Sequence, residues 1–342
     1  MPLEPPLVRA PDFHQGPWLQ SLSPITIEGL RGQVGLIHFW DFTCINCVRT
    51  LPYLRAWIDR YADAGFLPIG IHTPEFPFAG DARLVAKASG RLGIRWPVLL
   101  DNDQHMWTSY ANRYWPTMYL IDARGYIRYR REGEGGYEET ENALRELLEA
   151  ASPGVFLPPV VGLLREEDAA GAVCAPVSPE LEVDSLAGGR PDLQTYSLPL
   201  SRPEGQFYAE GTWVLEEEAL TLAEAGGSIV VPFRAADVYA VLSSGPTADS
   251  LPADPVLTSI ELDGRPLASS HYGADIFLDR GHSCIRVEAP RLYHLVSGLP
   301  PSAHELRLRA DTPGWTLYSF SFGTCLVTPS TLTAAPEEAR SC

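Results

Sequence analysis

The stretch HFWDFTCINCVRTLP, from His38 to Pro52, decides the fold of the first half of this 342-residue chain. Cys44 and Cys47 lie directly after the apolar run 34–40 and directly before apolar residues at helical spacing. The run predicts a strand buried on both faces, and the spacing predicts a helix. A cysteine at such a junction lies near the helix N-terminus, where free N–H groups and the helix dipole favour a thiolate.

The spacing within the pair suits thiol–disulfide exchange. A thiolate at Cys44 attacks a disulfide, and Cys47 is close enough to attack the mixed disulfide and release the reduced substrate. A structural zinc site needs four ligands, and the other cysteines are isolated in the sequence: Cys174, Cys284, Cys325 and Cys342. A purely structural disulfide is disfavoured because the cysteine content is low. We therefore expect a redox-active disulfide, no metal and no bound cofactor.

The charge balance is acidic, with 43 Asp and Glu against 26 Lys and Arg and a net charge of -17. Nucleic acids and anionic membranes bind basic surfaces, so neither is an expected partner. The N-terminal residues lack the basic and apolar regions of a signal peptide. No apolar run approaches the roughly 20 residues that cross a bilayer. The expectation is a cytoplasmic protein without membrane insertion, or an extracytoplasmic one if it is separated from a membrane partner.

Strands and helices alternate along residues 25–151, which predicts an α/β domain. Within it, residues 25–33 indicate a short strand and turn. Residues 117–132 indicate a hairpin whose turn contains Gly125. Residues 1–24 are rich in proline, and we expect them to form an extended N-terminal arm.

The sequence changes character after residue 151. Residues 152–195 are rich in Pro, Gly, Ser and acidic residues and are expected to form a linker. Residues 196–330 contain short alternating runs between turn residues, which predicts an all-β, jelly-roll-like sandwich, and residues 331–342 form a tail. Cys284 and Cys325 could pair across this sandwich, although in a reducing compartment the more frequent role is that of buried small hydrophobic residues. Five aromatic residues could stack on sugars, although core packing is the more frequent role: Tyr208, Trp213, Tyr239, Tyr272 and Trp315.

The segment GLIHFWDFTCINCVRTLPYL resembles the active-site segment of thioredoxin-fold proteins, and more narrowly that of the DipZ/TlpA-type branch. Other segments fit the same branch: IGIHTPEF, WPVLLDND, NRYWPTMYLID followed two residues later by Gly, and GEGGYEETE. The resemblance covers about Ser21 to Ala151. It implies a thioredoxin-like fold and thiol–disulfide oxidoreductase activity. In pattern and order, the β-rich half resembles the carbohydrate-binding-module-like domain that follows the thioredoxin domain in DipZ proteins.

The resemblance also implies residues that support the cysteine pair. Trp115 and Pro116 match the loop whose proline is cis in the family and faces the cysteines; the alternative is a trans proline that opens a strand. Glu75 matches an acidic residue near the active site of TlpA-like proteins, where it could accept a proton and tune both thiols. The alternative for Glu75 is a solvated loop carboxylate. Pro52 matches the helix-kinking proline of thioredoxins.

His38 occupies the position where thioredoxins carry a buried acid, six residues before the first cysteine. A neutral imidazole there could take the proton of Cys47, or His38 could be a buried histidine with a structural hydrogen bond. Whether His38 or Glu75 is the proton acceptor stays open. Trp40, together with Trp115, could form an apolar wall for docking a substrate, or it could pack in the core.

Three functions compete. The first is a thiol–disulfide oxidoreductase that acts on protein or small-molecule disulfides and needs an electron donor. The second is a thiol peroxidase with Cys44 as the peroxidatic cysteine, although Ile37 and Asp41 occupy two positions of the P-x-x-x-T-x-x-C pattern. The third is a glycan- or protein-binding module, residues 196–330, with an accessory redox domain. DipZ proteins usually carry electron-delivering membrane helices before this domain, so the redox direction and the donor stay open.

Overall fold

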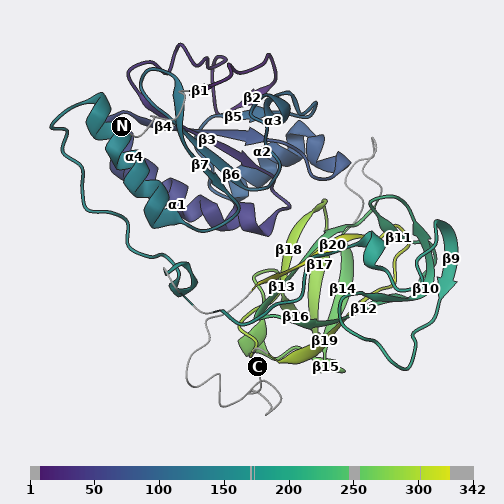
Figure 1. Ribbon diagram of the computed structural model, residues 1–342. Coiled ribbons are helices and arrows are strands. Elements are labelled where there is room, and N and C mark those ends of the chain that lie inside the picture. The colour runs from purple at the N-terminus through teal and green to yellow at the C-terminus, as the bar shows by residue number, and fades with distance from the viewer. Residues whose placement is uncertain (1–7, 170–171, 173, 246–254, 301, 324–342) are drawn as a thin grey trace. The chain divides into compact units, whose positions relative to one another are not determined.

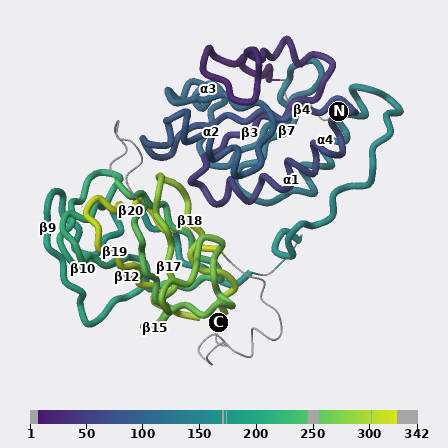
Figure 2. Tube along the Cα trace, turned by 180° about the vertical axis from the view of Figure 1, so that it is seen from behind, coloured from purple at the N-terminus to yellow at the C-terminus, as the bar shows by residue number. Residues whose placement is uncertain are grey.

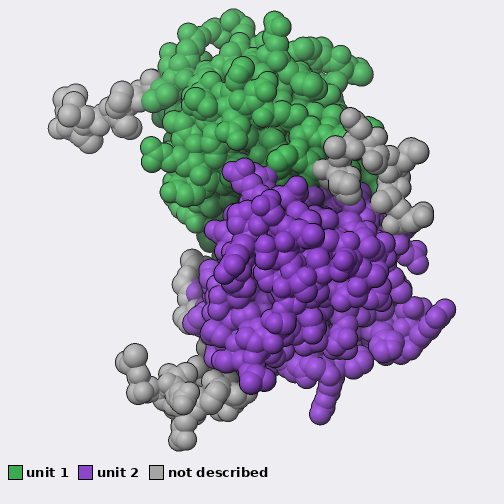
Figure 3. Space-filling model, turned by 90° about the vertical axis from the view of Figure 1, so that its right-hand side faces the viewer, with its two compact units in different colours: residues 1–170 green, residues 171–342 purple. Residues whose placement is uncertain are grey.

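The protein divides into two compact units, residues 1–170 and 171–342, in a computed structural model (Figures 1 and 3). The structure describes residues 8–169, 172, 174–245, 255–300 and 302–323. The division falls inside the segment 152–195 that we expected to be a linker.

Unit 1 is built on one seven-stranded sheet. Its strands, in spatial order, are β1 (Val8–Arg9), β7 (Tyr126–Glu132), β6 (Thr117–Ile121), β3 (Val34–Trp40), β4 (Phe66–His72), β5 (Val98–Leu100) and β2 (Trp18–Leu19). The central strand β3 runs parallel to β4 and antiparallel to β6. All seven β3 residues are buried, as its apolar run predicts.

Helices and loops cover both faces of this sheet. The helices are α1 (Ile45–Tyr61), α2 (Ala82–Arg91), α3 (His105–Ser109) and α4 (Tyr137–Ala151), with short 3-10 turns η1 (Ala62–Ala64) and η2 (Pro77–Gly80). Successive strand residues point to opposite faces. Ile37 and Phe39 therefore pack with Met106 of α3, whereas His38 points to α1, where it contacts Thr50. In Figure 1, α4 lies beside α1.

The thioredoxin-like α/β fold predicted for this region is confirmed, with local differences. The hairpin forms as β6 and β7, and Gly125 in its turn has a φ of 87°, which glycine adopts readily. Residues 27–32 form turns and not the expected strand. The part of the N-terminal arm that the structure describes adds β1 and β2 to the sheet, where they pair with β7 and β5.

The first part of the expected linker is bound to unit 1. Pro159 O accepts a hydrogen bond of 2.6 Å from Arg60 of α1, and Val161 N donates to the buried carboxylate of Glu141 on α4. Farther along, Asp168 in η3 (Glu166–Asp168) accepts a hydrogen bond of 2.6 Å from another α1 side chain, Tyr53. An extended Pro-rich segment offers carbonyls and N–H groups to which side chains can hydrogen-bond. We call residues 158–168, which contact unit 1 in this way, the strap.

Unit 2 is all-β, as predicted. Its strands are β8 (Leu181–Glu182), β9 (Asp192–Tyr196), β10 (Tyr208–Leu215), β11 (Leu220–Leu222), β12 (Gly227–Arg234), β13 (Asp237–Ser243), β14 (Val256–Leu262), β15 (Arg265–Pro266), β16 (Phe277–Asp279), β17 (His282–Val287), β18 (Arg291–Val296), β19 (Ala303–Ala310) and β20 (Thr316–Gly323), with 3-10 turns η4 (Val183–Ser185) and η5 (Ser269–His271). Figure 2 follows their path. Strand β10 pairs with β12 through residues 208–210 and with β9 through residues 211–215, so it joins two groups of strands. The jelly-roll topology stays a prediction. Strands β8 and β9 begin before residue 196, where we expected the sandwich to start.

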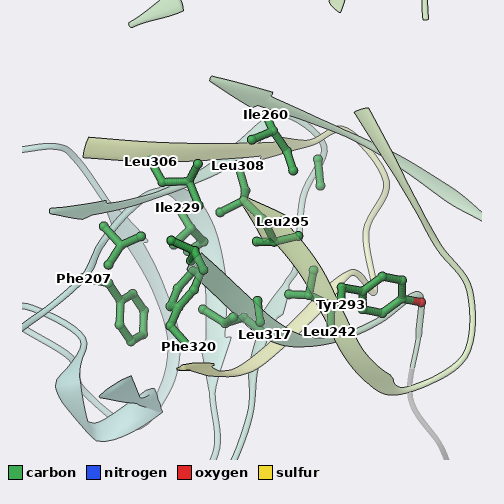
Figure 4. Close-up of a cluster of buried hydrophobic side chains, with 14 of the residues drawn as sticks. Phe207, Ile229, Leu242, Ile260, Tyr293, Leu295, Leu306, Leu308, Leu317 and Phe320 are labelled. Atoms are coloured by element: carbon green, nitrogen blue, oxygen red, sulfur yellow. The ribbon is translucent and has the colours of Figure 1, made fainter. Parts of the chain in front are cut away.

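The core of unit 2 lies between these groups of strands (Figure 4). Ile229 and Leu308 come from β12 and β19, and Leu317 and Phe320 come from β20. Most of the aromatic residues considered as a sugar platform belong to the interior: Tyr208, Trp213 and Trp315 are buried, and Tyr239 and Tyr272 are half-buried. A buried ring offers no face to a glycan, so core packing is the role of these three.

Among the helices in the described parts of the chain, none is both long enough and apolar enough to cross a bilayer.

Candidate active site

The cysteine pair lies at the strand-to-helix junction that the sequence predicts. Cys44 is the N-cap residue of α1, and its Sγ accepts a hydrogen bond of 3.2 Å from Cys47 N. The two sulfur atoms are 2.7 Å apart, and both thiols are free. Cys44 is partly exposed, whereas Cys47 is buried. The Cys44 thiol is therefore the more accessible of the two.

The local field opposes thiolate formation at both sulfurs. Burial raises the pKa of Cys44, although the hydrogen bond from the Cys47 thiol lowers it; the carboxylates of Glu75 and Asp41 raise it further. Burial and the hydrogen bond donated to Cys44 raise the pKa of Cys47 well above its usual value. The expected depression of the Cys44 pKa by the helix N-terminus is thus outweighed by burial and two neighbouring carboxylates.

Asp41 is a site residue that the sequence-based expectations do not include. It is fully buried, and its Oδ1 accepts hydrogen bonds of 2.6 Å from both the N–H and the hydroxyl of Thr43. Its Oδ2 accepts a hydrogen bond of 3.0 Å from Glu75 N and lies 3.6 Å from Nε2 of His72. An Asp two residues before a Thr at a strand end is the signal for such a turn, but the link to Glu75 is visible only in the fold.

Strand topology brings Glu75 to the cysteine pair. Because β3 and β4 are parallel, Trp40 and His72 end at the same sheet edge, and Glu75 follows three residues later. Its loop is fixed there, since Thr73 N donates to Trp40 O at 3.2 Å. The partly exposed Glu75 carboxylate lies 3.3 Å from the Thr43 hydroxyl. Glu75 therefore contacts Thr43, the residue that precedes Cys44.

The proline loop reaches the same edge, because β6 runs antiparallel to β3 and begins opposite its end. The Trp115–Pro116 peptide bond is cis, as the resemblance predicts. Trp115 Nε1 donates a hydrogen bond of 3.1 Å to Thr73 O, which ties this loop to the Glu75 loop. Tyr114 is 55% exposed. The proline loop thus carries partly exposed aromatic rings. The expectation for Trp40 as a docking wall is wrong, because its ring is fully buried in the core.

His38 lies beneath the first turn of α1, but it does not contact a sulfur through any hydrogen bond in the described residues. Its Nε2 is 3.1 Å from the hydroxyl of Thr50, which donates its single hydrogen to Cys47 O at 2.7 Å. Nε2 is therefore the donor to Thr50, and the proton-free nitrogen is Nδ1. Burial lowers the pKa of His38 to about 3, so the ring is neutral at physiological pH. This geometry favours the alternative that His38 is a buried histidine with a structural hydrogen bond.

Other candidate ligands are dispersed. Within the part of the chain that the structure describes, no group of three or more His, Cys, Asp and Glu side chains is placed to hold a metal ion. Cys174 and Cys284 are free, and Cys284 is buried in β17. Cys325 and Cys342 lie outside the described residues, so whether Cys284 and Cys325 pair stays open.

Comparison with known proteins matches both halves of the chain. Residues 7–130 match the AhpC/TSA family, and residues 183–323 match the family described as thioredoxin like C-terminal domain. The Protein DipZ of Mycobacterium bovis is 33% identical over 305 residues, which are 88% of this chain and 40% of that protein. This chain thus spans about two fifths of the length of that relative.

Two shorter relatives match the N-terminal part. The thiol-disulfide oxidoreductase YkuV of Bacillus subtilis is 26% identical over 132 residues, 38% of this chain and 87% of YkuV. The thiol-disulfide oxidoreductase ResA of Bacillus thuringiensis is 26% identical over 123 residues, 36% of this chain and 68% of ResA. Over 88% of its length the chain is therefore similar to the Protein DipZ, and its two halves match the AhpC/TSA family and the family described as thioredoxin like C-terminal domain.

Proposed function

We propose that the protein is a thiol–disulfide oxidoreductase in which Cys44 attacks and Cys47 resolves. The carrying observation is the asymmetry of the pair: sulfurs 2.7 Å apart, with Cys44 partly exposed and Cys47 buried. Cys44 attacks a substrate disulfide, and one substrate thiolate leaves. Cys47 then attacks Cys44 Sγ, the second substrate sulfur leaves as a thiolate, and the pair is oxidised by two electrons.

The resolving step needs a proton acceptor, because burial keeps Cys47 in its thiol form. We propose Glu75 for this role. Its carboxylate is partly exposed, so it can exchange a proton with water, and it is joined to the Cys44 loop through Thr43. His38 does not suit the role, since its pKa is about 3 and its Nε2 is engaged with Thr50. The position of Glu75 supports its assignment as the proton acceptor. His38 is excluded because its imidazole does not take up a proton near neutral pH.

For the substrate we propose protein disulfides that dock beside Trp115 and Pro116. The cis peptide bond turns this loop at the sheet edge where Cys44 lies, and Tyr114 adds exposed aromatic surface. An external thiol would regenerate the reduced pair. For unit 2 we propose protein binding and not glycan binding, because three of the five aromatic rings considered for sugar stacking are buried.

The direction that we propose is reduction of substrates. A strongly oxidising pair has a stabilised reduced form, usually through a depressed thiol pKa. Here burial and two carboxylates raise the pKa of Cys44. A reducing pair suits a cytoplasmic location, which we keep as part of the proposal.

The test uses the full chain, reduced and mixed with a protein disulfide such as insulin. Cys44→Ser should abolish reduction, whereas Cys47→Ser should accumulate a mixed disulfide visible as an added mass. Activity that survives Cys44→Ser, or the lack of any adduct with Cys47→Ser, would contradict the assigned roles. Rapid peroxide consumption that depends on Cys44, without disulfide reduction, would favour the thiol peroxidase instead.

A further inference from the structure

We propose that Asp41 is a positioning residue that holds Glu75, through Thr43, as a proton-carrying group beside the cysteine pair. This inference rests on the proposed function. Asp41 lies three residues before Cys44. Thioredoxins carry their buried acid at a different position, which corresponds to residue 38, and this chain has a neutral histidine there.

The first step of the argument is that one carboxylate joins two loops. Oδ1 of Asp41 binds the N–H and hydroxyl of Thr43, on the segment that leads into Cys44. Oδ2 binds Glu75 N, on the loop that follows β4. The side chain of Asp41 is fully buried, so water cannot replace these bonds. The position of Glu75 relative to Cys44 therefore depends on Asp41.

The second step concerns the single proton of the Thr43 hydroxyl. This hydroxyl lies 2.6 Å from Oδ1 of Asp41 and 3.3 Å from Oε2 of Glu75, so its hydrogen is donated to Asp41. The hydroxyl oxygen then has a free acceptor site toward Glu75. Only the protonated carboxyl of Glu75 can donate to that site. Asp41 thus holds the Thr43 oxygen where it can accept a hydrogen bond from Glu75 whenever that carboxyl carries a proton.

The third step concerns the titratable groups around Asp41 and Glu75. The titratable groups that face Cys44 are Cys47 on α1, Glu75 on the loop after β4, and Asp41 after β3. His72, at the end of β4, faces Asp41, but 3.6 Å from Nε2 to Oδ2 is too long for a hydrogen bond. Burial lowers the pKa of His72, so the imidazole is neutral and does not cancel the charge of Asp41.

In the proposed resolving step Glu75 is the proton acceptor, because its carboxylate is close enough for its charge to act on the Cys47 thiol. The proton of the Cys47 thiol passes to the Glu75 carboxylate, and the Cys47 sulfur attacks Sγ of Cys44 in the mixed disulfide. The bond between Cys44 and the substrate sulfur breaks, and its electron pair leaves with the substrate. The proton on Glu75, hydrogen-bonded to Thr43, is then available to the departing thiolate.

The experiment compares Asp41→Asn with a matched control, Asp122→Asn, in the full chain. Asp122 is also buried and also accepts two backbone N–H groups, at 3.0 Å each, but it lies after β6, at the far end of that strand from Pro116. In Asp41→Asn the amide oxygen still accepts from Thr43, while the amide nitrogen faces Glu75 N and cannot accept. Two quantities are measured against pH: the alkylation rate of Cys44, and the single-turnover rate at which Cys47 releases glutathione from Cys44.

We expect Asp41→Asn to lower the pH midpoint of Cys44 alkylation, because a negative charge is lost. We expect it to slow glutathione release at pH 7 by about a hundredfold or more, since proton transfer by a positioned side chain contributes roughly 10²- to 10⁴-fold. Glu75→Gln should slow release similarly, and the double variant should be no slower than the slower single variant. Asp122→Asn should leave both profiles unchanged.

If Asp41 acted independently of Glu75, the losses in release rate of Asp41→Asn and Glu75→Gln would add in the double variant, and that result overturns the proposal. If Asp41→Asn does not fold, Thr43→Val removes the hydroxyl link with Asp41 intact, and an unchanged release rate in that variant overturns it equally. Failure of the proposed function is distinct, because the unmodified protein would then release no glutathione at all.

Discussion

His38 shows, at the scale of a single residue, how burial decides what a side chain can do. The same position in thioredoxins suggests acid–base chemistry, yet here the ring is fully buried and bonded to Thr50. Burial favours the neutral imidazole and removes it from titration near neutral pH. The buried acid near the pair is instead Asp41, which accepts hydrogen bonds from Thr43 and from Glu75 N.

The buried neutral His38 makes stability depend on pH. Its folded pKa is about 3 against 6.5 when unperturbed, so below pH 6.5 the unfolded chain binds a proton that the folded chain does not. Stability is therefore complete above pH 6.5 and is lost as pH falls towards 3, by up to about 1.4 kcal/mol per pH unit. Urea unfolding at pH 7.5 and 5.5 should show a smaller loss for His38→Gln than for the unmodified protein. The exposed His282→Gln serves as the control, and equal losses in all three proteins would contradict the assignment.

Thr50 links His38 to the carbonyl of Cys47 and is itself fully buried. Thr50→Val keeps the shape but leaves the Nε2–H of His38 without an acceptor. We expect the free energy of unfolding to fall by about 1 to 3 kcal/mol, the cost of an unsatisfied buried polar group. Chemical denaturation measures this, and a variant as stable as the parent would show that the hydrogen bond is absent in solution.

Elements with a strong local pattern are those that the sequence predicts. The apolar run of β3, the helical spacing of α1 and the turn glycine of the hairpin each act within a few residues. The strap and the Asp41 network depend on partners far away in the sequence, such as Glu141 for Val161 and Glu75 for Asp41. Composition alone predicts a linker at residues 152–195. Its Pro, Gly and acidic residues do not indicate which distant side chains will bind this segment.

The strap is held to unit 1 by polar contacts with α1 and α4. The buried Glu141 accepts from Val161 N and from the Tyr61 hydroxyl, so Glu141→Ala leaves both donors unpaired. We expect faster proteolysis within residues 158–168 and a loss of about 2 kcal/mol or more in the unfolding free energy. Glu146→Ala, on the exposed face of α4, is the matched control. Equal cleavage rates for both variants would mean that Glu141 does not anchor the strap.

At the scale of the whole molecule, two units with separate cores account for the two family matches. We expect a fragment of residues 1–170 to fold and to keep the reactivity of the cysteine pair, because the contacts described for the site lie within unit 1. A fragment of residues 1–151 lacks the strap and should unfold at a lower temperature. Circular dichroism and thiol alkylation of both fragments check this; equal melting temperatures would assign the strap no role in unit 1.

The reduction potential of the Cys44–Cys47 pair tests the central claim most directly. The full chain is equilibrated with dithiothreitol or glutathione buffers, the remaining thiols are alkylated, and the masses are measured. We predict one reversible two-electron couple near or below about -230 mV, in the range of reducing thioredoxin-like pairs. It should disappear in both Cys44→Ser and Cys47→Ser. A couple between about -180 and -120 mV would contradict the reducing direction, and the absence of any reversible couple would contradict the disulfide chemistry itself.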